Sequence, residues 1–82
     1  MKTQKIYHST LFKKARARAM TFEGDVFPSD CIEILKDVYG PRLDRINPET
    51  IYKMILTLMD IPDPDDIAQK YITEAVNDFI NS

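Results

Sequence analysis

The final third of the chain carries apolar residues in adjacent pairs that recur about every four positions. This spacing is typical of an α-helix with one apolar face, because residues three and four positions apart lie on the same side of a helix. The positions between the pairs are polar or charged. The sequence therefore predicts an amphipathic helix here, whose apolar side consists of Ile67, Ala68, Tyr71, Ile72, Ala75, Val76, Phe79 and Ile80.

Two start signals that contain proline precede the third and fourth predicted helices. Asn47-Pro48-Glu49 combines a capping side chain, a proline suited to the first helical position and an acid at the positive end of the helix dipole. Asp63-Pro64 repeats the signal for the last helix, and we expect Asp63 to be its cap.

The second predicted helix has a start and a stop signal of its own. Asp30 and Glu33 have the spacing of a capping box, with Asp30 as the cap. Gly40-Pro41 ends the helix, because glycine can adopt the left-handed conformation and proline cannot continue a helix.

The first predicted helix begins at Ser9 or Thr10 and runs to about Phe22. The alternation of alanine with other residues at positions 15–19 would also suit a strand. Alanine favours helices and disfavours strands, so we predict a short basic amphipathic helix.

The third predicted helix, which runs to about residue 59, is apolar around nearly its whole circumference. A helix of this kind is buried on most sides. Four short helices in a chain of 82 residues would leave part of it uncovered, so we expect a homodimer or another protein partner. The expected dimer or partner interface lies on the third and fourth helices and comprises Tyr52, Ile55, Met59, Tyr71 and Phe79.

Charge is divided unevenly along the chain. The first eighteen residues contain six bases and no acid, whereas the remainder contains thirteen acids and five bases. The two parts therefore carry formal charges of +6 and −8, which give the net charge of −2. Segregation of this kind bears on binding partners rather than on the fold.

Four of these bases fall in the first predicted helix and are the candidate contacts for an anionic partner: Lys13, Lys14, Arg16 and Arg18. Several interpretations are open. The bases can form a solvated face that pairs with the acidic part of the same fold, or they can bind an anionic protein. They can also bind nucleic acid, whose phosphates attract clustered Lys and Arg. A membrane surface is a further possibility, although the apolar arc of the helix is too weak to anchor it alone.

No catalytic, cofactor or metal signature stands out. Cys31 is expected to be a small core residue, and a single cysteine excludes an internal disulfide. His8 has no positioned partner for nucleophilic catalysis. An acidic cluster before the last helix lacks the glycine of an EF-hand loop, and helix-start acids explain it more simply. Its members are Asp60, Asp63, Asp65 and Asp66. We therefore expect no enzymatic activity, no cofactor and no metal.

Residues 46–60, followed by a short polar break and a final amphipathic helix, resemble the C-terminal half of the small AriR/YmgB-type bacterial regulators of biofilm formation and acid stress. The shared features are an apolar residue followed by Asn, here Ile46-Asn47, then a very apolar helix and a closing helix. The resemblance covers about residues 30–80. It leaves residues 1–18 without a counterpart, and the prolines after Asp60 depart from the pattern. It implies an all-helical homodimer that regulates through protein or DNA contacts without catalysis, and it assigns no functional residues.

Together these features predict an all-α single domain over residues 1–82, with four short helices and residues 1–8 as a mobile arm. The longest apolar run is too short to span a bilayer, and there is no signal-peptide pattern. We therefore expect a cytoplasmic protein from a bacterium or phage. Its expected function is that of a small non-enzymatic interaction protein, a regulator, adaptor or inhibitor that binds a protein partner stoichiometrically. The alternative is a nucleic-acid-binding regulator that uses the basic N-terminal segment.

Overall fold

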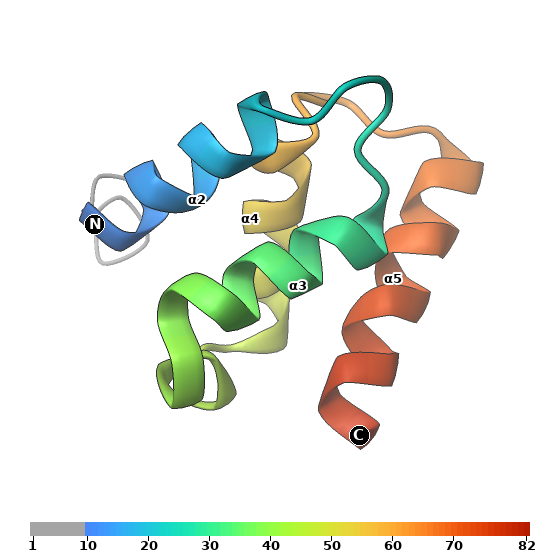
Figure 1. Cartoon of the computed structure of the whole chain (residues 1–82). Helices are drawn as coiled ribbons and strands as arrows, with labels where there is room; N and C mark the ends of the chain where they lie inside the picture. The colour runs from blue at the N-terminus through green and yellow to red at the C-terminus, as the bar shows by residue number, and fades with distance from the viewer. Residues whose placement is uncertain (1–9) are drawn as a thin grey trace.

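Helices account for all the regular secondary structure of residues 10–82, the part of the chain that the computed structural model describes (Figure 1). These are α2 (Thr10–Met20), α3 (Pro28–Tyr39), the 3-10 helix η1 (Gly40–Arg45), α4 (Pro48–Leu58) and α5 (Asp66–Asn81).

The predicted all-α class with four α-helices is confirmed for this part of the chain. The alternating segment at positions 15–19 is helical, so the strand interpretation is excluded. The predicted arm, residues 1–8, lies outside the described residues.

α3 occupies the centre of the fold. α2 packs against one side of it and α5 against the other, and α4 lies behind α3 in contact with all three (Figure 1). α2 and α5 are therefore at opposite edges of the molecule. Among the helices of residues 10–82, none combines the length and the apolar composition needed to cross a membrane.

The start of α4 follows the sequence signal. The backbone N–H of Glu49 donates a hydrogen bond of 2.8 Å to Oδ1 of Asn47, and Pro48 takes the first helical position. This arrangement satisfies one of the N–H groups that a helix leaves unpaired at its first turn. The predicted cap is confirmed.

The caps of α3 and α5 differ from the prediction. α5 is capped by Asp65, not Asp63, because Oδ1 of Asp65 accepts a hydrogen bond of 2.8 Å from the N–H of Ala68. Both acids suit a cap. With Asp65 as the cap, Pro64 lies before the helix, where its missing N–H costs no helical hydrogen bond. Asp30 is likewise not the cap of α3. It lies inside the first turn, and its Oδ2 accepts a hydrogen bond of 3.0 Å from the N–H of Phe27.

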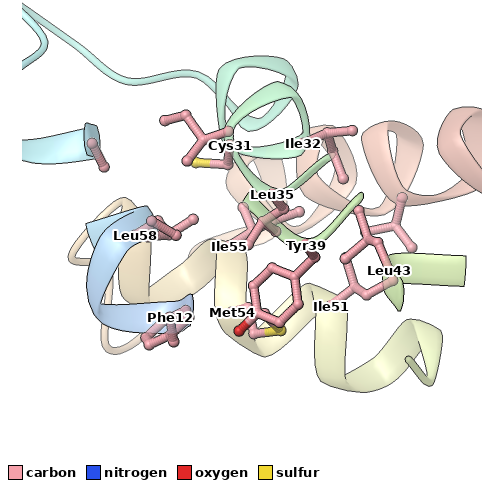
Figure 2. Close-up of a cluster of buried hydrophobic side chains, with 14 of the residues drawn as sticks. Phe12, Cys31, Ile32, Leu35, Tyr39, Leu43, Ile51, Met54, Ile55 and Leu58 are labelled. Carbon is pink, nitrogen blue, oxygen red and sulfur yellow. The ribbon is translucent and has the colours of Figure 1, made fainter. Parts of the chain in front are cut away.

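The core draws side chains from every described helix. Figure 2 shows Phe12 of α2, Leu35 of α3 and Ile55 of α4 in one cluster, and each is at most 1% exposed. η1 adds Leu43 and α5 adds Ile72.

A single chain covers most of α4. Ile51, Met54 and Ile55 are fully enclosed, and Leu58 is also buried. The expectation that α4 needs a second subunit for its burial is therefore wrong. The reason is that α2, which is distant in the sequence, and η1, which directly precedes α4, contribute large apolar side chains to the same core. The apolar side chains that remain most exposed lie elsewhere, at Met20, Phe27, Ile67 and Tyr71.

Candidate functional site

Large apolar side chains gather at the surface where the first turn of α3 meets α5. Phe27, Ile67 and Tyr71 are 61%, 67% and 58% exposed, respectively. They border an open groove of about 700 Å³, which we call the α3–α5 groove. It is lined by Phe27, Pro28, Ser29, Met59, Asp65, Ile67, Ala68, Tyr71, Glu74, Ala75 and Asp78.

α5 forms the long wall of the groove. Its residues 67, 71, 74 and 78 follow one another at intervals of four, three and four, which aligns them in one stripe along the helix. Ala68 and Ala75 lie beside this stripe and are partly buried. Because alanine is small, the space between the stripe and the start of α3 stays open.

The opposite wall is the residue that precedes α3 and the first turn of that helix. Phe27 is held at the edge by its backbone, because its N–H donates to the carboxylate of Asp30 and its carbonyl accepts from the N–H of Cys31. Met59, which follows α4, completes the apolar lining. A methionine side chain adapts its shape to what packs against it.

Among residues 10–82, the charged side chains that line the groove are all acidic. They are Asp65, Glu74 and Asp78. Asp65 is occupied as the cap of α5. Glu74 and Asp78 form no ion pair or side-chain hydrogen bond within residues 10–82. The groove thus combines an apolar end near Ile67 and Tyr71 with an acidic end.

The basic face of α2 is a second surface. Phe12, Ala15 and Ala19 turn towards the core, which leaves the four predicted contact residues exposed to solvent. Those residues are Lys13, Lys14, Arg16 and Arg18. Arg18 forms an ion pair with Asp37 of α3, and the other three have no ion pair within residues 10–82. Of these four bases, therefore, only Arg18 pairs with an acid within residues 10–82.

The structure separates the five predicted interface residues. Met59 and Tyr71 line the α3–α5 groove. Tyr52 and Phe79 are partly buried against the core. Ile55 is fully buried within its own chain, so it offers no surface to a partner, and its assignment to an interface is wrong.

Sequence patterns missed Phe27, Ile67, Glu74 and Asp78 as groove residues. The available signal was the width of the apolar stripe on α5. With two apolar residues in every four, the apolar stripe of α5 is wider than the surface that the neighbouring helices cover. The part of the stripe that they do not cover is exposed at Ile67 and Tyr71.

The remaining candidates for chemistry have structural roles or lie elsewhere. Cys31 is a buried core residue, as predicted, and burial together with the charge of Asp30 raises the pKa of its thiol to about 12. No group of three or more His, Cys, Asp or Glu side chains within residues 10–82 is arranged to hold a metal ion. His8 lies outside the described residues.

No family model, no curated protein and no solved structure matches this chain. The resemblance to AriR/YmgB-type regulators stays a prediction from the sequence pattern. Any assignment of function to this chain rests on the two surfaces described above.

Proposed function

We propose that this protein is a small non-enzymatic interaction protein that binds a protein partner stoichiometrically through the α3–α5 groove. The observation that carries the proposal is the contiguous exposure of Phe27, Ile67 and Tyr71 around one groove. Contiguous apolar patches on a folded domain mark interaction sites, whereas isolated exposed apolar residues are common and carry no such meaning.

The shape of the groove favours a macromolecule over a small ligand. Sites for small molecules enclose roughly 70–90% of the ligand surface. Here the bordering side chains are themselves more than half exposed, so a small molecule would stay largely in water. A partner protein can cover the groove and its edges together. Tyr71 is suited to anchor such a contact, because tyrosine is enriched among the residues that dominate interface energies.

A pair of double variants tests the proposal. Ile67→Ala with Tyr71→Ala removes the exposed apolar side chains of the groove. Met20→Ala with Ile80→Ala removes two exposed apolar side chains outside it. All four side chains are about half exposed or more, so both variants should keep a thermal unfolding curve close to that of the wild type.

The tagged proteins are then used to capture partners from an extract of the native host. A protein retained by the wild type and by the control, in a fixed molar ratio, and lost from the groove variant supports the proposal. Equal retention by the groove variant contradicts it.

The basic face of α2 supports a second candidate function, a nucleic-acid-binding regulator. The observation that favours it is that Lys13, Lys14 and Arg16 are exposed on one helix and form no ion pair with any other residue of 10–82. Binding to duplex DNA through about three phosphate contacts gives a log–log salt slope of about −3. Replacement of these three bases by glutamine should abolish binding, and Lys70→Gln, on α5, should not. Absence of DNA and RNA binding at about 50 mM salt would rule this candidate out.

A further inference from the structure

We infer that the occupant of the α3–α5 groove is a basic amphipathic helix of a partner protein. Its apolar side chains would fill the space over Ala68 and Ala75, and its Lys or Arg side chains would pair with Glu74 and Asp78. The inference rests on the proposed function, because it specifies the chemistry of the partner for the same groove.

The dimensions of the groove fit a helix. Its long wall extends over residues 67–78 of α5, which at the rise of an α-helix corresponds to about 16 Å, or roughly three turns. The axes of packed helices lie about 8–10 Å apart, and small side chains at the contact allow the shorter distances. Ala68 and Ala75 provide small side chains along the groove.

The order of side chains along α5 matches an amphipathic partner. Ile67 and Tyr71 provide an apolar end. Glu74 and Asp78 follow on the same stripe and provide an acidic end. A helix with an apolar face flanked by bases would bury its apolar side chains at the first end and place cations at the second. This is the helix-in-groove mode of recognition.

The two acids at this end are unfavourable for α5 itself. Glu74 and Asp78 are four residues apart on one helix, and like charges at this spacing repel. Asp78 also lies in the last turn, where the negative end of the helix dipole disfavours an acid, and that turn contains no base. Neither carboxylate has a cationic partner within residues 10–82. A bound cation would relieve both repulsions.

The start of α3 does not offset this negative charge. A helix N-terminus carries the equivalent of roughly half a positive charge. Here the carboxylate of Asp30 accepts a hydrogen bond from the N–H of Phe27, and its negative charge compensates part of the positive charge at the start of α3. Three carboxylates line the same groove, so its net charge favours a cationic partner.

A second copy of this chain fits the groove less well. In a two-fold dimer the two grooves would face each other, and each would present three carboxylates and no base of residues 10–82 to the other. The basic helix α2 of another copy has the right charge. Its apolar face, however, is already buried against its own core through Phe12, Ala15 and Ala19.

Two synthetic peptides test the inference. Both are helical, about 16 residues long, with the same leucine stripe. One has Lys at the flanking positions and the other has Glu. Their binding to the full chain is measured by fluorescence anisotropy. We expect the Lys peptide to bind roughly tenfold or more tightly than the Glu peptide at about 50 mM salt. The difference should shrink at about 500 mM salt, where charges are screened.

Three sets of substitutions locate the contact. Glu74→Gln with Asp78→Asn should remove most of the preference for Lys while the melting temperature stays the same or rises. Asp44→Asn with Asp63→Asn removes two exposed acids outside the groove and should keep the preference. Ile67→Ala with Tyr71→Ala should weaken binding of both peptides.

The outcomes separate this inference from the proposed function. Equal binding of both peptides, lost in the Ile67→Ala/Tyr71→Ala variant, overturns the basic helix but leaves a protein-binding groove. Binding that is insensitive to all the groove substitutions overturns the inference, and the extract capture then decides the function separately. Self-association that is abolished by the same groove variant, measured by sedimentation, identifies a second copy as the occupant and overturns the inference.

Discussion

The guanidinium of Arg18 forms an ion pair with the carboxylate of Asp37, and within residues 10–82 this is the one ion pair that joins two different helices. The two side chains are 50% and 66% exposed. Exposed pairs contribute about 0.2–1 kcal/mol, because water and salt screen them. A double-mutant cycle with Arg18→Ala and Asp37→Ala should therefore give a coupling free energy below about 1 kcal/mol that disappears at about 1 M salt. A coupling free energy above about 2 kcal/mol would contradict the description of this ion pair as exposed and weak.

The cap of α5 gives a prediction that distinguishes two neighbouring acids. Asp65→Ala should lower the free energy of unfolding by about 1 kcal/mol, because it removes the acceptor for the N–H of Ala68. Asp63→Ala should change it by less than about 0.5 kcal/mol, since Asp63 is exposed and outside the helix. Urea denaturation of both variants measures the difference. The reverse order of effects would place the cap at Asp63.

Ile55 should be essential for folding because it is fully buried in the chain's own core. Ile55→Asp should give no cooperative unfolding transition, since it places an unpaired charge among apolar side chains. Ile55→Val should fold and lose about 1 kcal/mol. Ile67→Asp is the control, because Ile67 is 67% exposed, and it should fold like the wild type. A cooperative melt of Ile55→Asp would refute the placement of Ile55.

Cys31 should be unreactive in the folded protein. Burial, with the charge of Asp30, raises the pKa of its thiol from 9.0 to about 12, so the reactive thiolate is scarce at pH 8. Alkylation at that pH should be slow, and denaturant should accelerate it. Rapid alkylation of the folded protein would contradict the burial.

The same shift predicts a dependence of stability on pH. The folded state holds the thiol proton more tightly than the unfolded chain does. The contribution of the protonated Cys31 thiol to stability is therefore complete below about pH 9 and declines as the pH rises towards 12. Other groups titrate in this range, so the measurement is the difference between the wild type and Cys31→Ala. The two unfolding free energies should converge as the pH rises, and a constant difference would contradict the shift.

The helices could be predicted because their signals are local. The paired apolar residues of α5 and the capping side chain of Asn47 act within a few positions of the chain. Local signals did not decide between Asp63 and Asp65, since both residue types cap helices well. At α3 the residue at the cap position is Phe27, which has no capping side chain, so the sequence favoured Asp30, which lies within the first turn.

Coverage of apolar surface could not be predicted, because it depends on residues far apart in the sequence. The apolar character of α4 suggested a partner, but Phe12 of α2, far from α4 in the sequence, helps to enclose it within one chain. The excess instead appears on α5, where Ile72 is buried and Tyr71 remains exposed to water. The groove needs this tertiary arrangement, so its residues could not be selected from periodicity alone.

The placement of α2 and α5 at opposite edges of the fold has an electrical consequence (Figure 1). α2 carries four bases and no acid, whereas α5 carries three acids and one base. A charged molecule within the Debye length, about 10 Å at 0.1 M salt, would exert a torque that turns the complementary side towards it before contact.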